Sequence, residues 1–369
     1  MPPRCLQPRL TSIHTLAPEE PPFGSAASFV AAPQLPNNHS GALCLEELLS
    51  PLPVASDCLD LLPQIRRAHK QKVDEIPWKE YDLSIEAGAA LPKGGLGADD
   101  QPLLTNPSVH CHAGRLVMAA RAMSPTSVQP PCTDVWRSRV VLTALAYGTT
   151  ANDTTEDAAT GHPRGVMRAR GCAVDLTTAS AEAFGKPVGS VQQEECARSG
   201  LAVSVGLGDE DPRLVSLGGT LHASLNGGRA QQTNDCASAH RQRAMRLQPL
   251  RPLGPAVELH WPATTETTHR NWLLFEHGGR THVLYSLQPH VVLELREAEG
   301  GACELIGASA NAVFEQRGGP FAGAALHLGA GPLLVSSAGG TPIYYVALFH
   351  TKDEDLDYQN YAYTFEPRP

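Results

Sequence analysis

Short apolar runs that alternate with polar residues cover most of this chain, and glycine pairs separate many of them. In the segment 208–226, an acidic stretch leads into an apolar run, the pair Gly218-Gly219 and a second apolar run. A two-residue turn between strands needs positive φ angles, which glycine adopts without steric penalty. The pattern therefore predicts a β-hairpin with Gly218-Gly219 as its turn.

The same hairpin pattern occurs three more times along the chain. These copies span residues 106–121, 271–287 and 331–350. The turn glycines Gly219, Gly279 and Gly340 lie about sixty residues apart, a repeat length that favours the blades of a β-propeller. Between the first and second copies the spacing is wider, because a polar insertion separates them. Other strand-like runs, which we expect to complete the blades, are 139–145, 168–176, 201–205, 244–247 and 291–295.

The two ends of the chain differ from this repeat. Residues 1–60 are rich in Pro, Ala and Ser, and only 43–49 and 58–62 show helical spacing. We therefore expect a poorly ordered N-terminal region over residues 1–95 and a propeller over 96–369. The chain ends soon after a strand-like run, so the last blade is expected to be incomplete unless N-terminal residues close it.

Composition excludes several classes of function. The formal net charge of −9 argues against a nucleic-acid binder, which needs a basic surface. The nine cysteines are scattered without metal-ligand spacing, which favours reduced thiols in an intracellular protein and predicts no metal site. No run reaches the roughly 18 apolar residues of a membrane span. A cytoplasmic location is therefore expected, an organellar leader stays open, and the sequence does not define the oligomeric state.

The acidic tip Asp209-Glu210-Asp211-Pro212-Arg213 is the densest group of candidate catalytic residues. In a propeller, equivalent positions of separate blades meet at one end of the central channel. Three carboxylates beside one arginine would repel one another and raise the pKa of at least one, while Arg213 would keep another ionised. Such an environment suits a general acid. The alternative is a solvated acidic turn.

The later copies supply basic and polar residues at similar places. His269, Arg270 and His350 would suit an anion such as phosphate, because arginine offers two parallel donors. Taken singly, a histidine of this kind is more often structural or exposed. Secondary site candidates are Glu210, Asn106, Arg121 and His290.

Three motifs taken together resemble a known family. Glu210-Asp211-Pro212-Arg213 follows a strand, Asn271-Trp272-Leu273-Leu274-Phe275-Glu276 comes next, and Ala347-Leu348-Phe349-His350 precedes Tyr361-Ala362-Tyr363. Over residues 100–366 this order is similar to the mannoside phosphorylases of glycoside hydrolase family 130 and to related propeller proteins, some of them mannosyltransferases. The resemblance implies an all-β fold, a five-bladed β-propeller.

The resemblance also implies roles for single residues. Asp211 corresponds to the general acid, with Arg213 orienting the reacting oxygen. His350 corresponds to a phosphate-binding histidine, and Arg270 or His269 lies near a substrate or phosphate contact. Further substrate-binding positions implied are Asn271 and Tyr363. Inorganic phosphate would be a co-substrate, and no other cofactor is implied. The segment before Asn271 matches only loosely, and the family's final blade is missing.

We therefore expect a carbohydrate-active enzyme that acts on an oligosaccharide or glycoside. It would cleave or transfer mannosyl or related glycosyl residues, by inverting phosphorolysis or by transfer from an activated donor. Phosphorolysis needs only one protein carboxylate, because phosphate itself is the nucleophile. The alternatives are a non-catalytic propeller that binds glycans or proteins, and a propeller glycoside hydrolase. The hydrolase would need a second carboxylate about 6.5–9.5 Å from the first to activate water.

Overall fold

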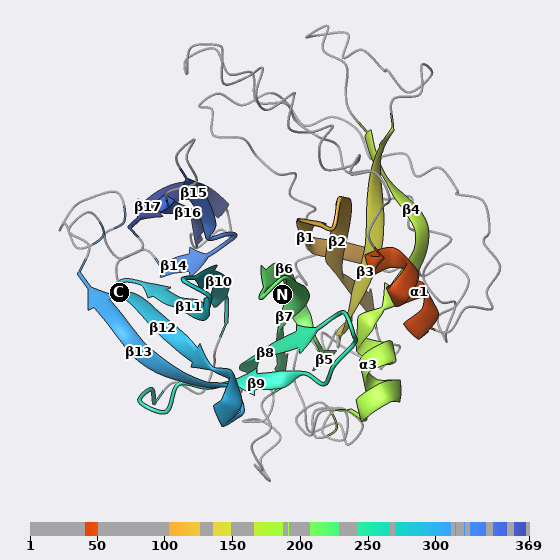
Figure 1. Ribbon diagram of the computed structural model, residues 1–369, viewed down its shortest axis with the longest axis horizontal. Coiled ribbons are helices and arrows are strands. Elements are labelled where there is room, and N and C mark those ends of the chain that lie inside the picture. Colours follow the sequence, from red (N-terminus) through yellow and green to blue (C-terminus); the bar gives the residue numbers. More distant parts are fainter. Residues whose placement is uncertain are drawn as a thin grey trace, which may run out of the picture.

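A computed structural model of the chain describes its strands and the connections that hold them together. The described residues are 41–50, 103–125, 136–148, 166–186, 207–228, 243–265, 270–310, 325–336, 342–352 and 358–366, with the single residues 191, 314 and 321. Four antiparallel sheets dominate this part of the chain and follow one another in chain order (Figure 1). We refer to these sheets as blades one to four.

Each blade is formed by strands that are close in sequence. Blade one contains β1 (Leu103–His112), β2 (Arg115–Pro125), β3 (Trp136–Gly148) and β4 (Val166–Asp175), with the short β5 (Leu207–Gly208) parallel to β3. Blade two contains β6 (Glu210–Leu217), β7 (Thr220–Gly228), β8 (Arg243–Pro249) and β9 (Val257–Leu259). Blade three contains β10 (Leu273–His277), β11 (Arg280–Leu287), β12 (His290–Arg296) and β13 (Ala302–Ser309). Blade four contains β14 (Ala325–Leu328), β15 (Leu333–Ser336), β16 (Pro342–Lys352) and β17 (Tyr358–Phe365).

The four repeated hairpins predicted from the sequence are present, one with Ala113-Gly114 and the others with glycine pairs as the predicted turn. They correspond to β1–β2, β6–β7, β10–β11 and β15–β16. Gly218 and Gly219 have φ angles of 56° and 77°, and Gly278 and Gly279 have φ angles of 58° and 73°, as a tight turn requires. Gly340 lies outside the described residues. The predicted all-β propeller arrangement is confirmed with four blades among the described residues, and the fifth blade is not confirmed.

Apolar layers hold successive blades together. Between blades one and two, Leu142 of β3 and Leu225 of β7 belong to one cluster. Between blades two and three, Trp272 packs with Leu293 of β12 and with β8. Between blades three and four, Phe275 lies 4.8 Å from Tyr345, measured between ring centroids. Stacking of this kind leaves the first strands of neighbouring blades side by side, with β1 and β10 both packed against β6.

Two helices lie against blade one. The predicted helical segment 43–49 is observed as α1 (Gly41–Leu49), whereas 58–62 lies outside the described residues. The second helix, α3 (Leu176–Phe184), was not expected from the sequence. Asp175 caps it, because its side chain accepts a hydrogen bond of 2.9 Å from the backbone N–H of Thr178.

The cysteines differ from expectation. Cys44 of α1 and Cys111 of β1 are both disulfide-bonded, so the prediction of reduced thiols is wrong for these two residues. Cys303 is a free, buried thiol, and burial raises its pKa to about 12.

Some sequence predictions cannot be compared with the described structure. The strand-like run 201–205 lies outside the described residues, as does the N-terminal region apart from residues 41–50. Within the described ranges, neither helix has the length and apolar character needed to cross a bilayer.

Candidate functional site at the start of the inner strands

The first strands of blades one and two share an irregularity near their beginning. In β1 the pairing with β2 shifts between Thr105 and Ser108, and in β6 the pairing with β7 shifts between Glu210 and Arg213. A residue with a left-handed backbone lies at this point in β1 and β6, just before β10 in blade three, and between β14 and β15 in blade four. These residues are Asn106 (φ 50°), Asp211 (φ 48°), Asn271 (φ 62°) and Gly331 (φ 92°).

This repeated backbone explains the residue types. Asparagine and aspartate adopt the left-handed region more readily than other residues with a side chain, and glycine adopts it most easily. A bulge of this kind redirects a side chain away from the alternation of the strand, and bulges are frequent beside active sites. The side chains of Asn106, Asp211 and Asn271 are therefore presented at the same end of three neighbouring blades.

Asp211 lies at the centre of this group. Its Oδ1 accepts a hydrogen bond from the side-chain amide of Asn106, which belongs to blade one. A guanidinium nitrogen of Arg121 lies 3.7 Å from the same oxygen, and the Asp211 side chain remains 25% exposed. Two polar groups of blade one thus hold the carboxylate in position while leaving it accessible.

The other two carboxylates of the acidic tip have arginines of their own. Glu210 forms ion pairs with Arg121 at 3.1 Å and with Arg243 at 2.8 Å. Asp209 lies 2.9 Å from Arg246, a close ion pair. The expectation of three carboxylates competing for one arginine is therefore wrong, because the bulge turns consecutive side chains toward different partners.

Arg213 connects three blades. From blade two, its Nε donates to the carbonyl of Gly329 at 2.9 Å, and its Nη2 donates to the carbonyl of Leu328 and to Oδ1 of Asn271, both at 3.1 Å. Its Nη1 is buried and has no hydrogen-bond partner among the described residues. Burial lowers the pKa of Arg213 to about 10, and the nearby charge of Asp211 opposes that shift. Arg213 remains a cation at neutral pH, with one donor group unused.

Two histidines of blade four face this group. The rings of His350 on β16 and His327 on β14 stack at a centroid distance of 5.3 Å. The pKa of His350 is lowered to about 4, mainly by burial and also by the charges of His327, Arg213 and Lys352, while Asp211 acts in the opposite direction. Asp211 and Arg213 therefore lie close enough to His350 for their charges to act on its imidazole. At neutral pH the imidazole is uncharged, so it can donate one N–H and accept one hydrogen bond.

Arg270 extends the cationic side of the site. It is exposed, and its charge contributes to lowering the pKa of both His327 and Arg243, so it lies within electrostatic range of each. His269 lies outside the described residues. We use the name "mouth cluster" for the residues Asn106, Arg121, Glu210, Asp211, Arg213, Arg270, Asn271, His327, His350 and Lys352.

Two further sequence-predicted site residues, Tyr363 and His290, contact each other and an apolar layer. Tyr363 and His290 have ring centroids 6.1 Å apart, and His290 lies 5.0 Å from Phe365. Tyr363 also packs against the apolar layer between blades three and four. Burial lowers the pKa of His290 and raises that of Tyr363. Their contacts are with this layer and with each other.

Sequence reasoning missed His327 and the part that Arg243 plays beside Glu210. His327 pairs with His350 across β14 and β16, a register that the sequence does not reveal. One feature of the sequence did mark this site: Asn106, Asp211, Asn271 and Gly331 occupy the same place at the start of the four repeated hairpins. Asn106, Asp211 and Gly331 are each followed by a proline.

The mouth cluster places one partly exposed carboxylate beside several cationic and neutral donors. Such a set can hold an anion next to a proton donor or acceptor. Among the described residues, no group of three or more His, Cys, Asp or Glu side chains has the arrangement needed to hold a metal ion.

Comparisons with known proteins give distant similarities. Neither a family model nor a curated protein matches the sequence. Similar solved structures include a mannose phosphorylase from Leishmania mexicana, with 11% identity, a TM-score of 0.40 and coverage of 85% of this chain and 75% of that one. A GDP-Man-dependent mannosyltransferase from the same organism has 12% identity, a TM-score of 0.39 and coverage of 83% and 75%. A family 117 glycoside hydrolase from Zobellia galactanivorans has 15% identity, a TM-score of 0.37 and coverage of 82% and 75%. Similarity at this level does not assign a function to the chain.

Proposed function

We propose that the protein is a carbohydrate-active enzyme that cleaves a mannoside or related glycoside by inverting phosphorolysis at the mouth cluster. The observation that carries the proposal is the position of Asp211, a partly exposed carboxylate beside the cationic and neutral donors of Arg213 and His350. One acid and one anion site are the two requirements of this reaction.

The charges support phosphate as the second substrate. Arg213 is cationic and has a guanidinium nitrogen without a hydrogen-bond partner among the described residues. His350 is neutral at neutral pH and can donate an N–H to a phosphate oxygen. Arg270 and Lys352 add positive charge within electrostatic range of the two histidines. The four cations of the mouth cluster outnumber its two carboxylates, Glu210 and Asp211, and this excess of positive charge favours a doubly charged anion.

The proposed reaction proceeds in one displacement. A phosphate oxygen attacks the anomeric carbon from the side opposite the leaving group, while the bond from that carbon to the glycosidic oxygen breaks. Protonated Asp211 transfers its proton to the departing oxygen, which leaves as a hydroxyl. The products are an inverted sugar 1-phosphate and a shortened acceptor, and Asp211 is left as a carboxylate. Asn106 and Arg121 act as positioning residues, because they hold the Asp211 carboxylate in place.

The experiment is phosphorolysis of manno-oligosaccharides, with sugar 1-phosphate as the measured product. Asp211→Asn keeps the size of the side chain and its place beside Asn106 but cannot donate the proton, so we expect kcat to fall by about 10²–10⁴-fold. The same variant should retain far more activity on 4-nitrophenyl mannoside, because that leaving group departs without protonation. This difference between substrates would not arise if Asp211 had only a structural role.

The controls separate this proposal from its alternatives. Asp209→Asn changes a neighbouring carboxylate that pairs with Arg246, and it should retain the leaving-group dependence of the wild type. Release of free sugar without a need for phosphate would favour hydrolysis instead. Binding of mannosides without turnover would favour a non-catalytic propeller. Equal activity of wild type and Asp211→Asn on the oligosaccharide would exclude Asp211 as the acid.

A further inference from the structure

Glu210, which precedes Asp211 in β6, is buried between two arginines from different strands. Its Oε1 lies 3.1 Å from Nη2 of Arg121 on β2 and accepts a hydrogen bond of 2.8 Å from Nη2 of Arg243 on β8. The side chain of Glu210 is 8% exposed and that of Arg243 is 2% exposed. One carboxylate oxygen therefore joins a cation of blade one to a cation of blade two.

Arg121 is shared between Glu210 and Asp211. Its Nη2 faces Glu210 at 3.1 Å, its Nη1 lies 3.7 Å from Oδ1 of Asp211, and its Nε donates to Oγ of Ser138 at 2.8 Å. The ion pair with Glu210 is the shorter of the two and involves the less exposed carboxylate. Coulomb attraction falls with distance and is stronger where water is excluded, so the charge of Arg121 is balanced more by Glu210 than by Asp211.

This balance matters for a general acid, which must carry its proton when the substrate is bound. A cation beside a carboxyl group favours the ionised form and so opposes this requirement. Asp211 has two cations at hand, Arg121 and Arg213, whereas the imidazole of His350 is neutral at neutral pH. Among the described residues, the carboxylate that lies against Arg121 besides Asp211 is that of Glu210.

We propose that Glu210 is a positioning residue that balances the charge of Arg121 and so allows Asp211 to carry the proton it donates. This inference rests on the proposed function, because it concerns the acid of that reaction. Glu210 acts through Arg121, which it holds beside Asp211 while offsetting its charge. Without the charge of Glu210, Arg121 would attract the ionised form of Asp211 more strongly, and the acid would lose its proton at a lower pH.

The test is the pH dependence of manno-oligosaccharide phosphorolysis by Glu210→Gln. Glutamine keeps the size of the side chain and an oxygen that can accept from both arginines, but it carries no charge. The kcat/KM of the wild type should fall at high pH, where the acid loses its proton. In the variant we expect this fall about one pH unit lower or more, and therefore an activity about tenfold lower at a pH above both transitions. At lower pH the activity of the variant should return, whereas misplacement of Asp211 would reduce activity at every pH.

Arg121→Gln should move the same fall in the opposite direction. It removes a cation beside Asp211 and leaves Glu210 paired with Arg243, so the acid should keep its proton to a higher pH. Because Arg121 also holds Asp211 in place, the maximal activity should decrease. The measured quantity is therefore the pH at which activity falls and not the height of the profile.

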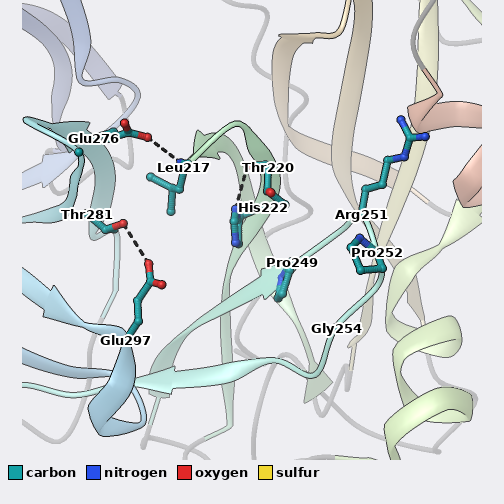
Figure 2. A pocket seen from close by; sticks show the side chains of 12 residues that line it. Leu217, Thr220, His222, Pro249, Arg251, Pro252, Gly254, Glu276, Thr281 and Glu297 are labelled. Carbon is teal, nitrogen blue, oxygen red and sulfur yellow. Dashed lines mark hydrogen bonds between the residues drawn. The ribbon is translucent and has the colours of Figure 1, made fainter.

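Two matched variants remove a carboxylate elsewhere in the chain. Glu294→Gln changes another buried glutamate between two arginines, Arg280 and Arg296 of blade three. Glu276→Gln changes a carboxylate at the opposite end of β6, where it accepts a hydrogen bond of 2.6 Å from the backbone N–H of Gly218 (Figure 2). A strand of 8 residues spans roughly 25 Å, well beyond the screening length of about 8 Å at physiological salt. Both variants should keep the wild-type profile, and the titration of phosphate itself is common to all of them.

The outcomes separate this inference from the proposed function. No sugar 1-phosphate from the wild type would overturn the proposed function and this inference with it. Turnover by the wild type, with the fall at the same pH in Glu210→Gln or with an equal shift in Glu294→Gln, would overturn the inference alone. Urea unfolding checks that each variant is folded. If Glu210→Gln is not, Arg121→Gln decides, and a fall that does not move to higher pH would overturn the inference.

Discussion

His350 shows how one buried imidazole connects the mouth cluster to stability. Its pKa is lowered from 6.5 to about 4, mainly by burial. Between these two values the unfolded chain binds a proton at this position and the folded chain does not. The corresponding stability is therefore complete above pH 6.5 and is lost progressively as the pH falls toward 4.

We expect His350→Gln to reduce the loss of stability on acidification. The measurement is the free energy of unfolding in urea at several pH values between 4 and 7.5, for wild type and variant. Because glutamine does not titrate, the variant should lose less stability over this range. Other partly buried histidines, such as His110 and His222, also have a lowered pKa. Part of the dependence of stability on pH should therefore remain in the variant. Identical slopes for the two proteins would contradict the assigned shift.

Single residues also show which part of the site could be predicted. Asp211 and Arg213 could be selected from the chain because acid, proline and arginine stand together after a strand-like run. The arginine partners of Asp209 and Glu210 could not be predicted. Arg246 and Arg243 belong to β8, and the register of that strand depends on the whole blade. Tyr363 was expected to bind substrate; it is partly buried and packs against the apolar layer between blades three and four, and its role in binding stays a prediction.

At the level of elements, the short strand β5 fixes the acidic tip against blade one. Gly208 has a φ of 98°, and a Cβ at this position would overlap the carbonyl oxygen of Ser138 in β3. The carbonyl of Gly208 accepts a hydrogen bond of 3.3 Å from Arg243, which also pairs with Glu210. The absence of a side chain therefore allows the close approach that places Glu210 and Asp211 beside Arg121.

Gly208→Ala should destabilise the protein more than Gly219→Ala does. Both glycines have positive φ, but a Cβ at Gly219 meets nothing within 4 Å. We expect Gly219→Ala to lower the free energy of unfolding by about 1–2 kcal/mol because of its backbone alone. Gly208→Ala should lower it by roughly 1–3 kcal/mol more, since β5 must also move away from β3. Denaturant unfolding of both variants gives the comparison, and equal losses would exclude the close approach.

The elements themselves were predictable to different degrees. Hairpins could be located from glycine pairs, because a tight turn has strict backbone requirements that few residues meet. The helix α3 was missed because its residues, Leu176–Phe184, follow a strand without a break and include several threonines and alanines with weak helical periodicity. Asp175 followed by Thr178 is the capping signal that could have identified it.

For the whole molecule, the repeat length indicated a propeller but not the number of its blades. The number of blades depends on whether the long insertion between the first and second hairpin copies adds strands, and on which segments complete each sheet. A repeat of about sixty residues determines neither. Hydrogen bonds of one particular side chain also link the blades. Besides the apolar layers, Arg213 reaches from blade two to the backbone of blade four and to Asn271 before blade three.

Arg213→Met should weaken the association of the blades. Methionine keeps much of the apolar length of arginine but removes every donor, so the carbonyls of Leu328 and Gly329 and the amide oxygen of Asn271 lose their partner. Leaving a buried acceptor without a hydrogen bond costs about 1–3 kcal/mol. Leu328 is buried, whereas Gly329 and Asn271 are half-buried, so water can partly replace the lost donors there. We therefore expect a total loss of about 2–5 kcal/mol in the free energy of unfolding.

The matched control for this change is Arg296→Met, which removes an arginine whose ion pairs, with Glu294 and Glu304, lie within blade three. Because that residue joins no two blades and lies near the surface, its replacement should shift the urea midpoint little. Circular dichroism and tryptophan fluorescence should follow one transition in the wild type and in Arg296→Met. In Arg213→Met the two signals should separate, because two of the four tryptophans, Trp261 and Trp272, report the layer between blades two and three while circular dichroism reports all strands. A single transition with an unchanged midpoint in Arg213→Met would show that the apolar layers alone hold the blades together.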